Sequence, residues 1–408
     1  MARPHAPRPD RRPRPAGTAA ATLAAVLALG AGCSQRISGS ERLVLAEDAA
    51  GDARASDGTP RRAPRREPSV EALRRFSTSF DGRTLPIFAP DGSRCAIQAA
   101  TTADWAVRVG DPLPPDGMDG RIEVLDCGPD AMGTPVARLD GPWLLGKGAS
   151  EAGVAVERPR ADGGRDVAVL RWDGTLDMLA EDGATNAFAT LGPGGVAAWS
   201  RRAPEGGDWQ LVVQRGDARR VIPAAPGSSL LVPTLAGDGT GVFALRLDGT
   251  AMGACWIAFG PDGLPPSGAG TRPDAFRPVC VAANLSLAVR AMEPQSGGAA
   301  SPPGRGDLVV WSPDAGRCEW WLPGNDMQPL GPGSMAALAL EDGDALCTTG
   351  SGLRHDRLGV EGVTSAPVSP ESWILRPTAA DPRIVMGSRF VGRRLEIAAL
   401  RIEPNSAK

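Results

Sequence analysis

One unit recurs along most of this chain and limits its fold more than any other feature: a turn of small residues followed by an apolar strand. The seven turns are centred on Gly92, Gly148, Gly195, Gly239, Asn284, Gly333 and Asp381. The intervals between them are 56, 47, 44, 45, 49 and 48 residues. A period in the forties with several strands per unit is typical of β-propellers, because each blade buries its faces only against neighbouring blades. The spacing predicts an all-β propeller of about seven blades over 76–404, mostly four-stranded antiparallel sheets.

Turn residues are correspondingly abundant. The 408 residues include 52 Gly, 39 Pro and thirteen Asp-Gly pairs. Asp-Gly is a strong hairpin signal, because both residues tolerate the positive φ of a type I′ turn. No stretch after Phe76 keeps a helical period over ten or more residues, so the periodicity favours strands throughout.

A propeller ring must also close, often with an N-terminal strand that completes the last blade. The apolar segment 395–402 is typical of a late strand in that blade, and its partner is expected at 76–80 or else at 42–46. Before this point, 69–75 predicts one short helix with Ser69 as its N-cap. The linker at 33–75 is otherwise rich in Ala, Asp, Arg, Ser and Pro, which predicts a disordered tether whose basic run, 61–75, is solvated.

The first 32 residues have the pattern of an export signal. Five Arg and one Asp precede an uncharged, Ala-rich run at 16–32, which is too weakly apolar to favour a membrane-spanning helix. The small residues before Cys33 resemble a bacterial lipobox, which implies lipidation of Cys33 and a membrane-anchored protein facing the periplasm or the cell surface. The match departs at Gly30, where lipoboxes usually carry Leu. Ordinary cleavage near Gly32 and an uncleaved anchor are the alternatives.

Six further cysteines follow the export signal: Cys95, Cys127, Cys255, Cys280, Cys318 and Cys347. An even number fits an oxidising compartment, and pairing in chain order is the simplest of the possible connectivities. Burial as free thiols is the alternative. No two of the six are close enough in sequence for a Cys-x-x-Cys metal or redox site.

Two segments resemble known propeller families. Residues 87–97, Ile-Phe-Ala-Pro-Asp-Gly-Ser-Arg-Cys-Ala-Ile, resemble the Ser-Pro-Asp-Gly repeat of the periplasmic Tol-system propeller and related bacterial WD-like repeats. Residues 308–321 resemble the quinoprotein-type repeat of the propeller lipoprotein in the outer-membrane barrel assembly machinery. Each resemblance covers one blade, and both imply an exported scaffold rather than a named activity.

Composition excludes several kinds of chemistry. His355 is the only histidine after the export signal, and the only lysines are Lys147 and Lys408, so multi-His zinc sites and most lysine-based mechanisms are excluded. The formal net charge is -3, and removing the +4 of residues 1–32 leaves about -7. This acidic balance argues against nucleic acid as a partner, because phosphate contacts need a basic surface.

The remaining motifs are better explained as structure. Gly141 to Gly148 matches the opening of a phosphate-binding loop, but Gly148 stands where that loop needs Ser or Thr, so a turn between strands is predicted. His355 is expected in a solvated loop. Calcium held by Asp-rich channel loops is the one cofactor considered, although turns already explain the Asp-Gly pairs.

Function is less constrained than fold. Trp320 and Trp321 are adjacent on a predicted strand and so point to opposite faces; they are candidate interface anchors, with packing between blades as the alternative. The primary hypothesis is a non-enzymatic cell-envelope scaffold that binds an envelope protein or peptidoglycan through loop aromatics and arginines. The alternative is an exported propeller enzyme, a lyase or hydrolase, that uses channel carboxylates with or without calcium.

Overall fold

A computed structural model gives the fold. It describes residues 68–78, 85–100, 120–235, 239–249, 251–267, 277–278, 308–312, 317–321, 328–329, 331, 334, 336–339, 345–359, 362–378, 383–392 and 394–403. Cys33, Cys280 and the alternative closing segment 42–46 lie outside these residues. In the part of the chain that is described, no helix is long and apolar enough to cross a membrane.

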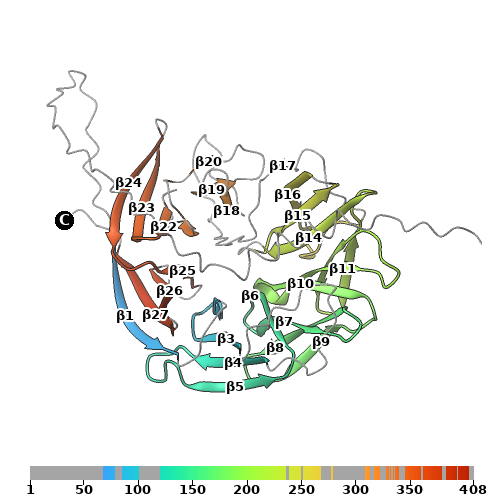
Figure 1. The fold of residues 1–408 in the computed structure, drawn as a ribbon, viewed down its shortest axis with the longest axis horizontal. Helices are drawn as coiled ribbons and strands as arrows, with labels where there is room; N and C mark the ends of the chain where they lie inside the picture. The colour runs from blue at the N-terminus through green and yellow to red at the C-terminus, as the bar shows by residue number, and fades with distance from the viewer. Residues whose placement is uncertain are drawn as a thin grey trace, which may run out of the picture.

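The described chain is all-β and its sheets follow one another around a ring in chain order (Figure 1). The first sheet has the order β2-β3-β4-β5, with strands at Ile87–Phe88, Arg94–Ala100, Gly120–Asp126 and Pro135–Asp140. The eight-stranded sheet that follows has β6 to β9 at Leu144–Ala149, Gly153–Pro159, Arg165–Arg171 and Leu176–Ala180, and β10 to β13 at Thr185–Leu191, Ala197–Arg202, Gln210–Arg215 and Ala218–Ile222. A short 3-10 helix, Pro193–Gly195, connects β10 to β11.

Four further sheets complete the arrangement. One contains β14 to β17, at Ser228–Leu235, Gly241–Asp248, Ala251–Ala258 and Arg277–Pro278. The next has three strands, β18 to β20, at Leu308–Ser312, Arg317–Trp321 and Gln328–Pro329. Then come β21 to β24, at Ala336–Ala339, Ala345–Thr349, Gly352–Gly359 and Gly362–Ser369. The last sheet has the order β1-β27-β26-β25, with β25, β26, β27 and β1 at Ile374–Pro377, Ile384–Val391, Arg394–Glu403 and Ser69–Ser77.

The arrangement is propeller-like, but the prediction of about seven blades, mostly of four-stranded antiparallel sheets, is wrong in its blade count. Within the described residues, four sheets have four strands, one has three and one has eight. The eight-stranded sheet arises because β6 and β10 pair in parallel at Lys147 and Thr190. Glycine makes this close approach possible: a Cβ at Gly148 would lie 2.4 Å from the Leu191 carbonyl oxygen, and one at Gly146 would lie 2.7 Å from the Ala189 carbonyl oxygen. These glycines belong to the segment whose sequence matches the opening of a phosphate-binding loop. Their lack of a side chain lets strands β6 and β10 approach closely enough to pair.

An N-terminal strand completes the last sheet, as ring closure requires, but it begins earlier than expected. Strand β1 pairs antiparallel with β27 from Ser69 opposite Glu403 to Ser77 opposite Glu396. The predicted helix at 69–75 is therefore wrong. Apolar side chains on this segment favour the strand. Val70 and Ala72 pack on the apolar cluster of the last two sheets, and Phe76 packs on the cluster shared with the first sheet. Tertiary packing outweighs the local capping signal.

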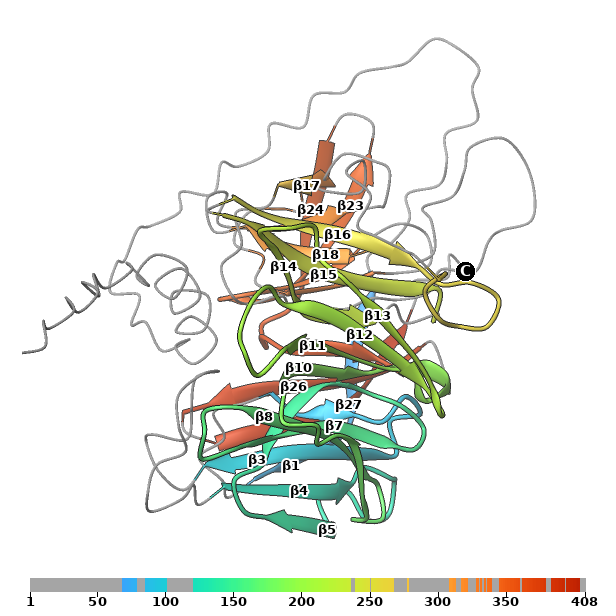
Figure 2. The ribbon, with the colours of Figure 1, turned by 90° about the vertical axis from the view of Figure 1, so that its right-hand side faces the viewer.

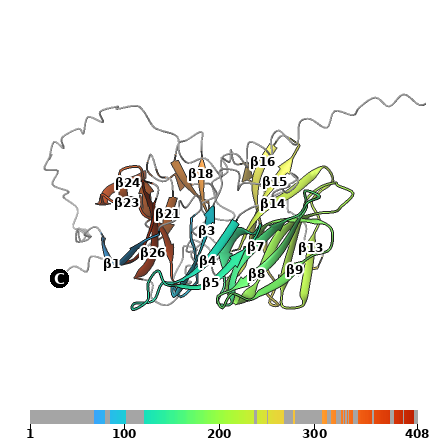
Figure 3. The ribbon, with the colours of Figure 1, turned by 60° about the horizontal axis from the view of Figure 1, so that its bottom comes forward.

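Apolar side chains fill the spaces between neighbouring sheets. Ile122 and Val124 of β4 pack with Val154 of β7 and Leu170 of β8. Leu211 of β12 packs in the same way with residues of β14 and β15. Figures 2 and 3 show these sheets from the side, with β6–β9, β10–β13 and β14–β17 stacked in turn. Packing sheet on sheet around a ring buries both faces of each sheet, as expected for a propeller.

Buried polar side chains also join neighbouring sheets. The Gln98 side chain on β3 donates from Nε2 to the Trp143 carbonyl over 2.9 Å and accepts at Oε1 from the Leu145 N–H over 2.8 Å. Glu157 on β7 accepts from the Ala189 N–H of β10 over 2.9 Å. Each bond ties a second strand to the inner strand of the next four-strand unit, so the inner backbone has partners beyond its own ladder.

The predicted Asp-Gly turns are present, but not as type I′ turns. Gly92, Gly163 and Gly174 have φ of 72°, 82° and 92°, whereas in the described residues no aspartate has a positive φ. Each preceding Asp side chain instead accepts the backbone N–H two residues ahead, as in the bond from the Ser93 N–H to Asp91 Oδ1 over 2.9 Å. In these three turns only the glycine enters the left-handed region, and the aspartate acts as a local cap.

Candidate functional site

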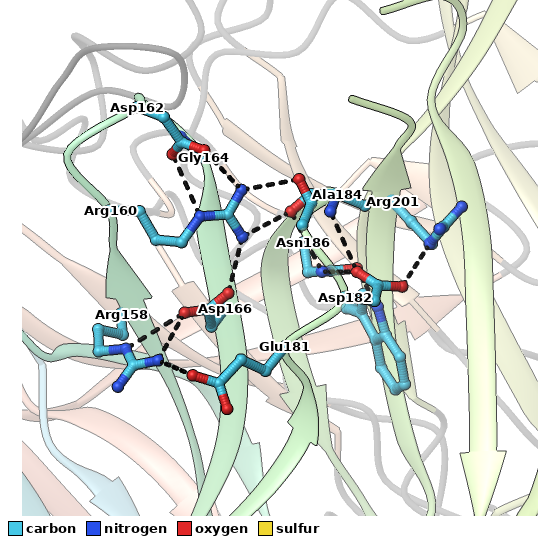
Figure 4. A network of polar contacts seen from close by, with 12 residues as sticks. Arg158, Arg160, Asp162, Gly164, Asp166, Glu181, Asp182, Ala184, Asn186 and Arg201 are labelled. Atoms are coloured by element: carbon cyan, nitrogen blue, oxygen red, sulfur yellow. Dashed lines mark hydrogen bonds and ion pairs between the residues drawn. The ribbon is translucent and has the colours of Figure 1, made fainter. Parts of the chain in front are cut away.

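The most extensive polar network in the described residues lies at one end of the eight-stranded sheet (Figure 4). Strands β6 to β9 form an antiparallel meander and β10 runs parallel to β6, so the β7–β8 turn at 160–164 and the β9–β10 connection at 181–184 lie at the same end. The first turn is closed by the Arg160 N–H donating to the Gly164 carbonyl over 2.9 Å. Two short, tight connections therefore place charged side chains side by side.

Asp166, the second residue of β8, is the centre of the network. Its carboxylate is 1% exposed. Oδ2 accepts from Arg158 Nη2 over 2.8 Å and Oδ1 accepts from Arg160 Nη1 over 2.7 Å. Both guanidinium groups are therefore held by one buried anion, and such charge-assisted bonds are the strong class.

Arg160 links the two connections directly. Its Nη1 and Nη2 donate to the carbonyls of Ala184 and Gly183, each over 2.9 Å, and its Nε donates to Asp162 Oδ1 over 3.1 Å. A planar guanidinium can serve several acceptors at once, which makes Arg suited to this position. The β9–β10 connection is fixed to the β7–β8 turn through this one side chain.

The network extends to β11 through Asp182. Its carboxylate accepts from Asn186 Nδ2 over 3.1 Å and from Arg201 Nε over 3.1 Å. Asn186 in turn accepts from the buried Trp199 indole N–H over 3.0 Å. A core tryptophan thus anchors the inner end of a chain of bonds whose outer end is a surface carboxylate.

Hydrogen bonding keeps these groups ionised at neutral pH. Bonds from Asp166 raise the pKa of Arg158. Bonds from the Arg160 guanidinium and the Gly164 N–H lower the pKa of Asp162. Burial alone would raise the pKa of Asp182, but bonds from Asn186 and Arg201 outweigh it and lower that pKa. A general acid at neutral pH needs a raised pKa, so the lowered pKa values of Asp162 and Asp182 do not fit that role.

The outward-facing groups are carboxylates. The side chains of Asp162 and Glu181 are 64% and 59% exposed, whereas those of their ion-pair partners, Arg160 and Arg158, are 19% and 35% exposed. Glu181 is bonded to Arg158 Nη2. At this network the arginines order the loops, and the more exposed groups are negatively charged. A binding role for loop arginines stays a prediction.

A second buried carboxylate, that of Asp356, lies next to His355 in the sequence. The structure of this segment differs from the solvated loop predicted for His355. Asp356 on β23 accepts from Arg354 Nε over 2.6 Å, from Ser365 Oγ over 2.7 Å and from the Gly331 N–H over 2.7 Å. His355 lies on the same strand and is 5% exposed. It is therefore a buried strand residue and not the solvated loop residue predicted, because β23 runs through the segment interpreted as a polar loop.

The cysteines fall into different surroundings. Cys95, Cys127, Cys255 and Cys347 are buried free thiols. Cys255 donates to the Ala244 carbonyl over 3.4 Å, and Cys347 donates to Asp356 Oδ2 over 3.2 Å. Burial raises the pKa of the Cys255 thiol to about 12.

The other predicted site residues are placed only by their backbone. Trp320 and Trp321 lie on β19 opposite Val309 and Leu308, and Cys318 lies opposite Trp311. An interface role for the two tryptophans stays a prediction. Among the described residues, no group of three or more His, Cys, Asp or Glu side chains is placed to hold a metal ion. The enzymatic alternative and its calcium also stay predictions.

The network residues were not singled out by sequence. Asp162-Gly163 and Asp182-Gly183 were recognised as turns, and their aspartates do act in turns. Arg158, Arg160 and Asp166 carried no separate signal, because Arg is common throughout the chain. What separates these residues from the many other arginines and aspartates is their place in the fold, where the ends of β7 to β10 come together.

Comparison with known proteins assigns neither a family nor a function to this chain. No protein-family model matches the sequence, and no curated protein matches it. Among solved structures, the Dos1 propeller is similar at 8% identity, with 81% of this chain and 95% of that chain covered and a TM-score of 0.47. TolB from Acinetobacter baumannii is similar at 10% identity, with 76% and 66% covered and a TM-score of 0.36. Porphyromonas gingivalis dipeptidyl peptidase 4 is similar at 9% identity, with 79% and 52% covered and a TM-score of 0.42.

Proposed function

We propose that this chain is a non-enzymatic protein-binding scaffold of the cell envelope, exported by residues 1–32 and anchored to the membrane by a lipid on Cys33. The basic segment, the apolar run and the small residues before Cys33 support export and lipidation. The ring of packed sheets supports the scaffold role, because loops on a rigid frame hold their geometry before a partner arrives.

One observation carries the binding proposal: the buried Asp166 fixes both arginines of the network, and they in turn fix two connections that present Asp162 and Glu181 to solvent. Exposed carboxylates on an ordered surface attract a partner of opposite charge and orient it. The partner class is therefore an envelope protein with an Arg- or Lys-rich surface. Peptidoglycan, the other partner considered, is an outcome that the experiment must separate.

Neutralising the two exposed carboxylates tests this proposal. We expect Asp162→Asn combined with Glu181→Gln to weaken partner capture by about tenfold and to reduce its salt dependence, because rim charges act mainly on association. The measurement is cross-linked capture from membranes with the full, anchored chain, followed by titration of the recovered partner at two salt concentrations. Asp140→Asn combined with Asp177→Asn is the matched control, because these carboxylates are exposed and ion-paired on the outer strands β5 and β9.

Three results would each contradict one part of this proposal: the binding surface, the partner class or the anchor. Equal loss in the control pair would move the binding surface away from the network. Binding to purified peptidoglycan that is unchanged by either variant would replace the protein partner. Mass spectrometry of the mature N-terminus tests the anchor separately: a start at any residue other than a lipidated Cys33 would contradict that part of the proposal and leave the loops untouched.

A further inference from the structure

Two thiols meet in the core between the first and last sheets. Cys95 on β3 and Cys127, directly after β4, are 0% and 1% exposed and belong to one apolar cluster with Leu125 and Leu395. The two side chains are hydrogen-bonded to each other. Cys255 and Cys347 instead donate to oxygen atoms, so of the four cysteines with described side chains these two are the pair in mutual contact.

The strand register holds this pair in place. Arg94 and Asp126 lie directly opposite on β3 and β4, and Arg94 Nη1 donates to Asp126 Oδ2 over 2.5 Å. Cys95 and Cys127 are the next residue on each strand, so they lie diagonally across the ladder on the other face. The Cys127 N–H donates to the Ser93 carbonyl over 2.8 Å, which extends the pairing past the end of β4. The backbone of the hairpin therefore places both thiols on the same face of the ladder, one register step apart.

We propose that Cys95 and Cys127 form a disulfide that fastens the β3–β4 hairpin. The co-reactant is a disulfide donor, such as an oxidised dithiol protein or oxidised glutathione. The first protein thiolate attacks one donor sulfur and releases a donor thiolate, which leaves a mixed disulfide. The second protein thiolate attacks the protein sulfur of that mixed disulfide and releases the second donor thiolate. The protein pair loses two electrons and two protons, and the donor gains them.

Burial decides when the bond forms. Contact with Cys127 and burial raise the pKa of the Cys95 thiol well above its usual value, so the folded chain holds little of the reactive thiolate. Exchange in the folded, reduced protein is therefore slow. The bond forms while the chain folds and both sulfurs are still accessible, and once buried it resists reduction. This inference is independent of the proposed loop binding.

Peptide mapping of the full chain tests the disulfide without a variant. The denatured reduced protein is refolded with or without oxidised glutathione, alkylated, and digested with trypsin. Cleavage after Arg94 and Arg121 leaves the two cysteines on separate peptides, 95–108 and 122–138. We expect the donor to produce one cross-linked pair of these peptides and loss of their alkylated forms. Donor added after folding should give the same product far more slowly.

Thermal unfolding supplies the second readout. The bond would close a loop between two residues 32 apart and so restrict the unfolded chain. Reductant present during the melt should lower the unfolding midpoint of the oxidised wild type by several degrees and leave that of Cys95→Ala/Cys127→Ala unchanged. Refolded protein that carries alkyl groups on both peptides despite the donor would overturn the proposal, as would an equal effect of reductant on the wild type and the double variant.

Discussion

Replacing Asp166 with alanine is expected to lower the free energy of unfolding by about 3 kcal/mol, because removing one partner of a buried ion pair leaves the other charge uncompensated. Asp166 is 1% exposed and receives bonds from Arg158 and Arg160. Both arginines keep a second carboxylate, Glu181 and Asp162 respectively, which limits the loss. The β7–β8 turn and the β9–β10 connection should loosen together, because Arg160 is bonded to both.

A graded series separates charge from shape. Asp166→Asn keeps an acceptor oxygen at nearly the same place but removes the negative charge, so we expect roughly half of the alanine effect. Asp177→Ala is the control, because it breaks an ion pair with Arg171 in which both side chains are about half exposed. Such surface pairs contribute roughly 0–1 kcal/mol. Urea unfolding at neutral pH measures all three variants.

Hydrogen exchange on the same proteins locates the effect. Faster exchange confined to 160–164 and 181–184 in Asp166→Ala would show local loosening, and it should accompany weaker partner capture if the loops form the binding surface. A loss of stability for Asp177→Ala as large as that for Asp166→Ala would contradict the central role given to the buried carboxylate.

Strand content and ring order were predictable because they depend on local patterns that repeat. Each turn of small residues limits a strand, and the interval between turns sets the number of strands per unit. The number of sheets was not predictable from the sequence. Strands β6 and β10 pair and join two four-stranded units into one sheet, and this pairing depends on Gly146 and Gly148, which allow the two backbones to approach. In sequence, those glycines look like any other turn residues.

Two further predictions were wrong because the local sequence is compatible with more than one structure. The stretch from Ser69 has an acceptable N-cap and so reads as a helix, yet β27 offers it a full antiparallel ladder. His355 stands among polar neighbours, yet β23 buries it. In both cases the deciding partner is distant in sequence, so a single-sequence pattern contains no sign of it. The Asp166 network is hidden for this reason only in part: Arg158 and Arg160 lie close to Asp166 in sequence, but Glu181 and the Ala184 carbonyl come from a later connection.

Lys147 gives the second large effect, and its size depends on pH. It lies on β6 between the two glycines and opposite Thr190, and its side chain is half-buried but closely surrounded by protein. In the part of the chain that the structure describes, its ammonium group makes no hydrogen bond or ion pair, although the charge of Glu157 acts on it. Burial lowers the pKa of Lys147 to about 8, and the charge of Glu157 opposes that shift only in part. The folded protein therefore binds this proton less tightly than the unfolded chain does.

The difference in proton binding by Lys147 between the folded and unfolded states determines how the free energy of unfolding changes with pH. A lysine whose pKa is lowered on folding destabilises the folded state while it is charged, so the full penalty applies below pH 8 and is relieved between pH 8 and about 10.5. The shift corresponds to about 3 kcal/mol if taken in full, and allowing for partial exposure leaves roughly 2 kcal/mol. Lys147→Met removes the titrating group and keeps a side chain of similar length.

We therefore expect the stability advantage of Lys147→Met over the wild type to be greatest at pH 7 and to shrink by about 2 kcal/mol as pH rises to 10.5. Urea unfolding of both proteins across this range measures the difference, in which the titration of the cysteines cancels because both proteins contain them. Lys147→Gln is the matched control: it also lacks the charge, so it should follow the same pH trend with a different constant offset, since a neutral amide packs less favourably than Met. A difference between wild type and variant that does not change with pH would show that the ammonium group is as well solvated on β6 as in the unfolded chain. The parallel contact with β10 would then carry no electrostatic penalty, and the two glycines alone would account for the merger of the sheets.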